Sequence, residues 1–342
     1  MRSPSPCPGL RLPEEPFIVH HWDADGIASA ALVARHKGAS GTAVPEIGVY
    51  SGDAIPSPPR GGTLLVLDYG IPGPEYVRLA ARLEAPLTVV DHHRVESPPP
   101  MPGLQYCNPV AEGRGGEEKY PAASLLVYQL LGAPRRAGDM LLAALGVVGD
   151  LAPFIDAGRS HPGLMLAAGL AEKAGTGLVE LRRLAARIDS CYRLLDTSCI
   201  KYAVEQAARD PYALLADRRL AEAEQRASRL LEEALQKLKP LREERDLRVY
   251  YLEMDAYVTS ALGRRLAADN PSGVAVLVHH IPQRRGGYIY ARSISRQLGG
   301  VIPELRSLGV KAGGKSHVVV IEYRGEPWGA LEKLLGLLER QR

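Results

Sequence analysis

The sequence predicts an α/β protein with two lobes: an N-terminal doubly wound, mainly parallel sheet and a smaller C-terminal α/β domain with a mixed sheet. Three observations support this. Strand and helix patterns alternate over the first 150 residues, a helical and charged stretch follows, and a second α/β pattern starts near residue 247. The chain has 342 residues, a length beyond which a single core rarely grows, so two domains are expected.

The N-terminal elements follow from short apolar runs separated by amphipathic segments. Strands are expected at 17–21, 45–50, 63–70 and 87–91, because these runs are rich in β-branched residues. Helices are expected at 25–36, 74–85, 122–132 and 137–150. Because helices separate the strands, the strands should lie parallel in a sheet with helices on both faces.

The middle and the C-terminal parts show different patterns. Residues 163–239 have helical periodicity without a sustained heptad, and 240–246 is a charged joint. Strands are then expected at 247–255, 273–281, 287–295 and 316–325, with helices at 257–269, 302–309 and 327–342. The predicted division is a flexible lead-in (1–16), a catalytic domain (17–190), a helical linker (191–246) and a substrate-binding domain (247–342).

Composition limits the class of protein. The net charge is +3, so nucleic-acid binding through bulk charge is excluded and any such contact must be local. Cys7, Cys107, Cys191 and Cys199 form no CxxC pair, which argues against a zinc ribbon and a disulfide framework. The same cysteine pattern fits a reducing cytoplasm, so we expect a cytoplasmic protein. No membrane span or signal peptide is visible in the sequence. The excess of Arg over Lys suggests a thermophile.

Acids and histidines gather where the predicted strands end. They are His20, His21, Asp23 and Asp25 after the first strand, Asp68, then Asp91, His92 and His93, and Asp150 at a helix end. Strand ends of a doubly wound sheet meet at one edge, and carboxylates brought together there need a cation. Oxygen and imidazole ligands suit Mn²⁺, with Mg²⁺, Co²⁺ or Zn²⁺ as substitutes. The number of ligands suggests two ions, an arrangement that drives in-line attack on phosphorus.

Each of these residues also has a purely structural interpretation. Asp23 or Asp25 can stabilise the N-terminus of the following helix, and Asp68 can begin a turn. Asp150 can be a plain helix end, although an acid there opposes the helix dipole. The four positions together favour the metal interpretation.

The ordered motifs HWDADG (21–26), VLDYG (66–70), DHH (91–93) and GVVGD (146–150) resemble those of the DHH phosphoesterase superfamily. The resemblance implies metal ligands at His21, Asp23, Asp25, Asp68, His92 and Asp150, with Asp68 as the bridge. It implies that His93 meets the scissile phosphate as a general acid and that Asp91 orients the metal-bound His92. Many members place a histidine where this chain has Val19. The position of His21 resembles the archaeal RecJ-like branch, and His20 is the alternative ligand.

The C-terminal lobe resembles the DHH-associated domain through ARSIS (291–295) and GGKSH (313–317). The resemblance implies that Arg292 and Ser293 hold a substrate phosphate, and that the Gly313 and Gly314 amides, Lys315 and His317 form an anion site. The alternatives are an exposed edge strand for the first segment and an ordinary loop for the second.

Three functions remain open. The first is a manganese-dependent exonuclease acting on single-stranded DNA or RNA, or on short oligonucleotides, with a strand path over Arg284, Arg285, Tyr288 and Tyr290. The second is a phosphatase for small nucleotides or a phosphodiesterase for cyclic dinucleotides. The third is a non-catalytic scaffold that binds replication proteins. The oligomeric state is open, with a homodimer as one option, and no membrane partner is expected.

Overall fold

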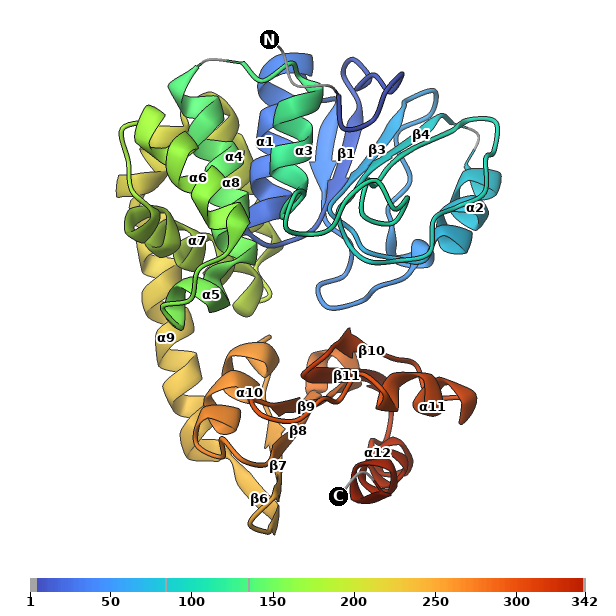
Figure 1. Ribbon diagram of the computed structural model, residues 1–342, viewed down its shortest axis with the longest axis vertical. Helices are drawn as coiled ribbons and strands as arrows, with labels where there is room; N and C mark the ends of the chain where they lie inside the picture. Colours follow the sequence, from blue (N-terminus) through green and yellow to red (C-terminus); the bar gives the residue numbers. More distant parts are fainter. Residues whose placement is uncertain (1–4, 84, 135, 341–342) are drawn as a thin grey trace. The chain divides into compact units, whose positions relative to one another are not determined.

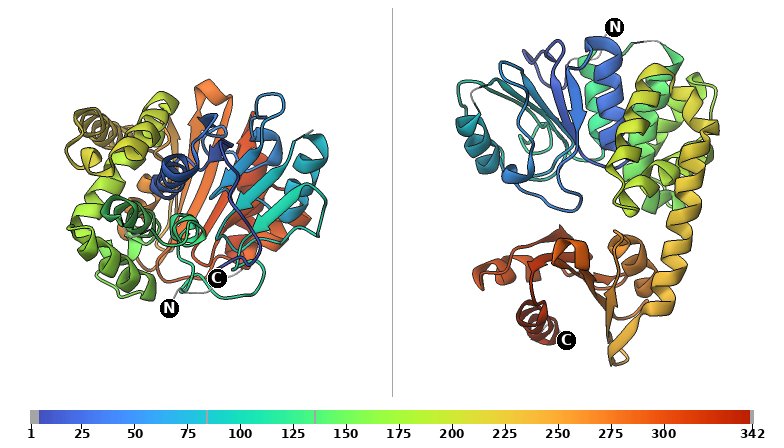
Figure 2. Two further views of the ribbon diagram at one scale, coloured as in Figure 1. Left: turned by 90° about the horizontal axis from the view of Figure 1, so that it is seen from above. Right: turned by 180° about the vertical axis from the view of Figure 1, so that it is seen from behind.

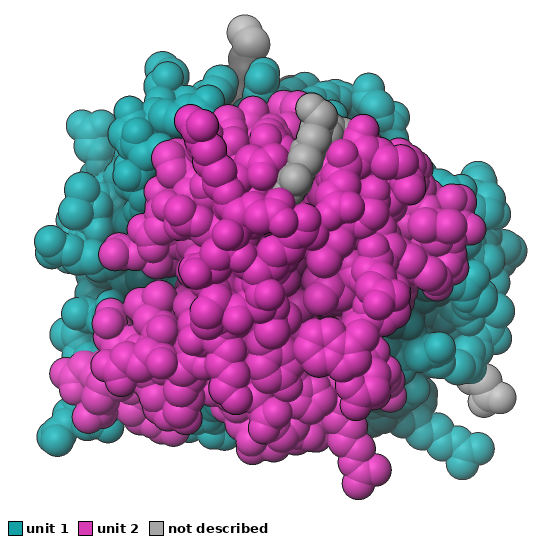
Figure 3. Space-filling view, turned by 90° about the horizontal axis from the view of Figure 1, so that it is seen from below, with its two compact units in different colours: residues 1–224 teal, residues 225–342 magenta. Residues whose placement is uncertain are grey.

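A computed structural model describes residues 5–83, 85–134 and 136–340. The chain divides into two compact units, Met1–Glu224 and Gln225–Arg342, which Figure 3 colours separately. The division falls inside helix α9 (Arg218–Lys237). No helix in the described part of the chain is long and apolar enough to cross a bilayer.

The first unit contains a five-stranded sheet that is parallel throughout, as predicted. Its strand order is β2-β1-β3-β4-β5. The strands are β1 (Phe17–His20), β2 (Gly41–Ala43), β3 (Leu64–Leu67), β4 (Leu87–Val90) and β5 (Leu104–Cys107). Every residue of β3 and β4 is buried, which explains why neither strand alternates apolar with polar residues: β3 is apolar throughout, and β4 has Thr88 as its one polar residue.

Helices cover both faces of this sheet. The first four are α1 (Ala24–Lys37), α2 (Gly73–Arg82), α3 (Ala123–Leu130) and α4 (Ala137–Asp150). A helical region continues through α5 (Ala152–Asp156), α6 (Pro162–Lys173), α7 (Leu178–Arg193), α8 (Thr197–Arg209) and the 3-10 turn η2 (Pro211–Ala216). Figures 1 and 2 show α1, α3 and α4 on one side of the sheet and α2 on the other. This confirms the doubly wound arrangement.

Two predictions for the first unit are wrong. Segment 45–50 is a turn and a loop, in which the Val49 amide donates to the Glu46 carbonyl at 2.9 Å, and the strand lies earlier, at β2. The lead-in is not a flexible tail over its described part, because Cys7 and Leu12 are buried. A short 3-10 turn, η1 (Gly52–Ala54), follows the loop.

The cysteines also differ from the prediction. Cys7 is bonded to Cys107 and Cys191 to Cys199, so no free cysteine remains in the described chain. The first bridge ties the N-terminal segment to the end of β5 across 100 residues of sequence. Spacing alone does not reveal such pairs, because partners distant in sequence meet only in the folded chain.

The second unit contains a six-stranded mixed sheet in the order β10-β11-β9-β8-β7-β6. Its strands are β6 (Lys239–Glu243), β7 (Leu247–Glu253), β8 (Val274–Ile281), β9 (Gly286–Ser293), β10 (Ala312–Lys315) and β11 (Val318–Arg324). Only β7 and β8 pair in parallel among the described strands of this sheet. Helices α10 (Thr259–Ala268), α11 (Val301–Ser307) and α12 (Trp328–Arg340) and the turn η3 (Pro282–Arg284) complete the unit.

Both edge strands of this sheet were missed. The charged joint at 240–246 is largely β6, and the GGKSH segment begins as β10. Apolar side chains from both faces of the sheet form cores: one includes Val276, Ile289 and Leu334, and the other includes Leu252, Leu262 and Tyr290.

Candidate metal centre

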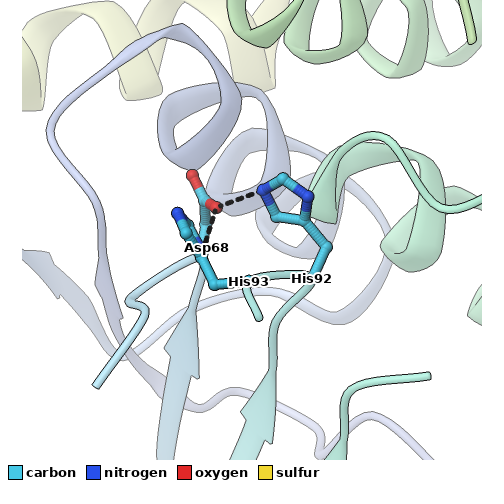
Figure 4. A group of neighbouring side chains, drawn as sticks. All are labelled: Asp68, His92 and His93. Atoms are coloured by element: carbon cyan, nitrogen blue, oxygen red, sulfur yellow. Dashed lines mark ion pairs between the residues drawn. The ribbon is translucent and has the colours of Figure 1, made fainter. Parts of the chain in front are cut away.

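The predicted acids and histidines of the first unit meet at the carboxyl edge of its sheet. They form three overlapping groups whose nitrogen and oxygen atoms lie within 4.8 Å of one another: Asp68, His92 and His93; His21, Asp23 and Asp68; and Asp25, His92 and Asp150. We refer to these seven residues as the acid–histidine cluster. Figure 4 shows Asp68 facing both His92 and His93 from neighbouring strands.

Asp68 belongs to two of the three groups. Its Oδ1 lies 3.3 Å from His92 Nε2 and 3.8 Å from His93 Nδ1, and its Oδ2 lies 3.9 Å from His21 Nδ1. The residue is 1% exposed, and neither carboxylate oxygen accepts a hydrogen bond within the described structure. Burial, followed by the nearby Asp25, raises the pKa of Asp68 well above its usual value. An ionised carboxylate that is buried without hydrogen-bond donors is energetically unfavourable, so we expect a cation to bind at this position.

The backbone of Asp68 is also unusual. Its φ of +57° lies in the left-handed region, where aspartate is one of the few non-glycine residues found regularly. Its amide donates to the Val90 carbonyl of β4 at 2.9 Å, so the strained turn is fixed to the neighbouring strand. Backbone strain of this kind is concentrated at functional sites.

Asp23 has the structural role that the sequence allowed, at the start of the following helix, whereas Asp25 binds the start of a different helix. Asp23 caps α1 by accepting from the Gly26 amide at 3.1 Å. Asp25 accepts from the amides of Ala123 and Ser124, at 2.7 and 2.9 Å, at the start of α3. Burial, together with the charge of Asp150, raises the pKa of Asp25 to about 7. Carboxylates have further lone pairs, so capping and metal ligation are compatible.

Of the two histidines at the end of β1, His21 lies in the cluster. Its Nδ1 is 2.8 Å from Asp23 Oδ2, and its Nε2 is 3.1 Å from the Tyr50 hydroxyl. Burial disfavours the charged imidazole, but the Asp23 carboxylate outweighs burial and raises the pKa of His21. His20 instead donates to the His21 carbonyl at 2.7 Å, and burial lowers its pKa to about 4. The alternative of His20 as the cluster histidine is therefore not supported.

His92 connects the strand ends to the end of α4. Its Nε2 lies 3.0 Å from Asp150 Oδ2 and 3.9 Å from Asp25 Oδ2. Burial lowers the pKa of His92, but the carboxylates of Asp150 and Asp68 outweigh that effect and raise it well above its usual value. Asp150 thus faces an imidazole, which explains an acid at a helix C-terminus.

His93 is oriented by Asp91. The Nδ1–H of His93 donates to Asp91 Oδ1 at 2.8 Å, and the amide of His92 donates to the same oxygen at 2.8 Å. The sequence predicted that Asp91 would orient the His92 ring, whereas the Asp91 carboxylate contacts the ring of His93 and the backbone amide of His92. Gly70 makes room for this ring, since a Cβ on Gly70 would lie 2.6 Å from His93 Cγ.

Comparison with known proteins agrees with these motifs. Residues 16–148 match the model of the DHH family, N-terminal domain. These residues belong to the DHH family. The match covers β1 to most of α4 and so includes every residue of the cluster except Asp150. The resemblance to the DHH phosphoesterase superfamily, which we inferred from the motifs, is confirmed. The assignment to an archaeal branch stays a prediction.

Solved structures support the fold of the whole chain. A DHH domain described as a member of a family of ribosomal proteins has a TM-score of 0.65 at 15% identity, covering 94% of this chain and 86% of that one. The exonuclease RecJ bound to manganese has a TM-score of 0.61 at 20% identity, covering 94% and 89%. RecJ of Thermus thermophilus with Mn²⁺ has a TM-score of 0.61 at 20% identity, covering 94% and 52%. Curated proteins yield no match.

The cluster of the DHH domain fits divalent cations. It offers four carboxylates and three imidazoles, a donor set that suits Mn²⁺ and Mg²⁺ and accepts Co²⁺ or Zn²⁺. The buried and unsatisfied oxygens of Asp68 lie where the groups overlap, as a bridging carboxylate would. The two ring nitrogens of His92 are also buried without a hydrogen bond in the described structure.

In the second unit, the predicted anion-binding residues have structural contacts of their own. The Ser293 hydroxyl donates to the Gly273 carbonyl at 2.7 Å and accepts from the Arg296 amide at 3.0 Å. Arg292 donates to the Tyr290 hydroxyl at 3.1 Å, and His317 Nδ1 lies 2.8 Å from the Arg296 carbonyl. Gly313, Gly314 and Lys315 pair with β11 as an edge strand. Their phosphate contacts stay predictions.

The predicted strand path is not a stacking surface. Tyr288 and Tyr290 are 2% and 5% exposed, so neither ring is available to a nucleobase. Arg284 lies over the Tyr288 ring and donates to its hydroxyl. Arg285, which is exposed, forms the turn with a φ of +48°. Tyr288 and Tyr290 lie on the same face of β9, as their alternation in the sequence predicted, but that face is buried.

Three residues near the cluster were missed. Asn108 donates to the His93 carbonyl at 2.9 Å, and it would have been found had β5 been predicted, because it follows that strand directly. Asp189 of α7 accepts from the Ala24 amide at the start of α1, at 3.1 Å. Tyr50 contacts His21 from a loop. Nothing in the sequence pattern signals the last two contacts.

Proposed function

We propose that the DHH domain hydrolyses phosphodiester bonds with the help of two divalent metal ions, physiologically Mn²⁺. The observation that supports this most is Asp68: a buried carboxylate without hydrogen-bond donors in the described structure, surrounded by three histidines and lying where two candidate ligand groups overlap. In this proposal the ions would be held by His21, Asp23, Asp25, Asp68, His92 and Asp150.

Two bound ions would neutralise the phosphate and supply an activated water. The chain's own residues then do the remaining work. His93 has its Nδ1 engaged by Asp91, which leaves Nε2 to hold or release a proton at the leaving oxygen. For the second unit, we propose separately that Arg292 and the segment 313–317 bind a phosphate.

The substrate class is single-stranded nucleic acid or short oligonucleotides. The burial of Tyr288 and Tyr290 favours the short end of this range, because a long strand needs a path of exposed aromatic and basic side chains. The same observation supports the second candidate, a small-nucleotide phosphatase or cyclic-dinucleotide phosphodiesterase. A scaffold role beside replication proteins is compatible with either activity.

The test is hydrolysis in Mn²⁺ of a labelled long single strand, a labelled dinucleotide and a cyclic dinucleotide, with Asp68→Ala as control. We expect cleavage of the dinucleotide that depends on Asp68 and little or no ladder from the long strand. A ladder of shortened products from the long strand would show that the protein is an exonuclease and that the strand does not follow the residues 284–290. No Asp68-dependent cleavage of any substrate would overturn the proposal.

A further inference from the structure

An exposed aromatic side chain borders the acid–histidine cluster. The Tyr50 side chain is 43% exposed, and its hydroxyl lies 3.1 Å from His21 Nε2. The other exposed aromatic side chains among the described residues are Tyr212 and Trp328. Of the three, Tyr50 is the one with a contact to the cluster, and neither the family motifs nor the sequence pattern points to it.

The ring of Tyr50 is fixed in place by its neighbours. It stacks on Tyr69 with a centroid distance of 5.8 Å and an interplanar angle of 13°, and it meets Trp22 edge-on at 5.4 Å. The Tyr69 hydroxyl donates to the Val49 carbonyl and accepts from the Ser51 amide at 3.2 Å. Both chain neighbours of Tyr50 are thereby pinned, so little conformational entropy is lost when a ligand packs on the ring.

The anchors of this ring are the same strand ends that carry the cluster. Trp22 lies directly before Asp23, and Tyr69 lies directly after Asp68. The Tyr50 ring lies beside both Tyr69 and His21, with centroid distances of 5.8 and 5.9 Å, and Tyr50 still keeps 43% of its surface exposed. A flat apolar surface at this position is suited to a nucleobase attached to a phosphate in the cluster.

We propose that Tyr50 is the platform on which the nucleobase next to the scissile phosphate stacks. This inference rests on the proposed function and narrows its substrate class to nucleotides and oligonucleotides, against phosphate esters without a base. Stacking uses the π face that all bases share, so the platform accepts purines and pyrimidines.

A competing role for Tyr50 is to orient His21 through its hydroxyl, as partners of metal-bound histidines do. Two substitutions separate the roles. Tyr50→Phe keeps the ring and removes the hydroxyl, whereas Tyr50→Leu removes both. Tyr212→Leu is the matched control, because Tyr212 is 37% exposed in the same unit and its hydroxyl contacts the Ala174 carbonyl.

The experiment measures KM and kcat in Mn²⁺ for 5′-phosphorylated diadenosine and for a dinucleotide of the same backbone without bases. We expect Tyr50→Leu to raise KM for the first by about tenfold or more, the usual effect of losing a stacking aromatic, and to leave KM for the second unchanged. Tyr212→Leu should stay close to wild type, and Tyr50→Phe should raise KM for the first dinucleotide much less than Tyr50→Leu does. Equal losses in Tyr50→Phe and Tyr50→Leu would overturn the platform and assign the effect to the hydroxyl, and an unchanged KM in Tyr50→Leu would overturn it as well.

A second measurement separates this inference from the proposed function. Binding of the same two dinucleotides is measured by calorimetry on Asp68→Asn, which is not expected to turn them over. Asparagine also tolerates the left-handed backbone of that position. If Tyr50 is the platform, the double variant Asp68→Asn with Tyr50→Leu binds the base-containing dinucleotide more weakly than Asp68→Asn alone. The two variants then bind the base-free dinucleotide equally well. Equal binding of both ligands would overturn the inference, even if wild type cleaves them.

Discussion

The Nδ1 atom of His93 lies 2.8 Å from Oδ1 of Asp91, and that oxygen also accepts from the backbone amide of His92. Burial disfavours the charged carboxyl, but the two histidines outweigh burial and lower the pKa of Asp91. Asp91 is therefore ionised at neutral pH and fixes the ring and the tautomer of His93. Two adjacent histidines thus have different partners, His93 on Asp91 and His92 on Asp150 and Asp68.

Replacing Asp91 by Asn should lower kcat by about 10–100-fold, the usual cost of losing an orienting carboxylate. Mn²⁺ affinity should change little, because the Asp91 carboxylate contacts the ring of His93 and only the backbone amide of His92, not the ring that would bind the metal. Steady-state kinetics and metal titration measure the two effects. Asp53→Asn is the control, since the Asp53 side chain is exposed and pairs with Arg82. A drop in Mn²⁺ affinity as large as the drop in kcat would contradict the assignment.

Gly70 should be required for the position of His93. A Cβ at this residue would lie 2.6 Å from His93 Cγ, so Gly70→Ala should displace the ring. We expect kcat to fall by up to about 10²-fold with a nearly unchanged melting temperature, because the half-buried ring can rotate away. Gly169→Ala in α6, where the Cβ meets open space, should be neutral or stabilising. Equal kcat values for both variants would show that His93 tolerates the displacement.

The second unit should lose stability in acid through His279. Its Nε2–H donates to the Met254 carbonyl at 3.2 Å, and its Nδ1 accepts from Thr259 Oγ1 at 2.8 Å. Burial lowers the pKa of His279 from 6.5 to about 4. The folded state therefore binds this proton less well than the unfolded state. The stabilisation is complete above about pH 6.5 and is lost as pH falls toward 4, by roughly 3 kcal/mol at most.

Urea unfolding at pH 7 and at pH 4.5 measures this effect in wild type and in His279→Gln, which has no titratable group at the position. The difference in unfolding free energy between the two pH values should be smaller in the variant. Parallel pH dependence in both proteins would show that His279 does not contribute.

The disulfide between Cys7 and Cys107 should stabilise the first unit. Cys7→Ser opens a loop of 100 residues and should lower the free energy of unfolding by about 2–5 kcal/mol. Cys191→Ser, whose bridge spans 8 residues, should cost less, because loop-closure entropy grows with loop length. Thiol titration in denaturant without reductant should find no free thiols in wild type. Four free thiols would contradict both bridges.

The sequence predicted the parallel sheet and its cluster because both depend on local signals. Buried strands such as β3 and β4 consist of apolar residues apart from Thr88, and the topology of a doubly wound sheet brings their ends together. The strands that were missed, β2, β5, β6 and β10, are short and partly exposed, so no apolar run marks them. Their pairing depends on neighbours that are distant in sequence.

Tertiary contacts account for the other errors. The alternation of Tyr288 and Tyr290 gave the correct face of β9, but α10 covers that face: a Cβ on Gly263 would clash with the Tyr290 ring. Gly263 of α10 therefore leaves room for the buried ring of Tyr290, and the sequence alone does not reveal that role. The contact between Tyr50 and His21 joins residues 29 apart through an irregular loop, and no periodic pattern encodes it.

Anomalous scattering from crystals soaked in Mn²⁺ tests the central claim most directly. We expect two manganese peaks about 3.5–4 Å apart, with Asp68 between them, and no peaks there in Asp68→Ala. The proposed ligands His21, Asp23, Asp25, His92 and Asp150 should surround the two peaks. A fully soaked wild-type crystal with no manganese at Asp68 would contradict the two-metal account.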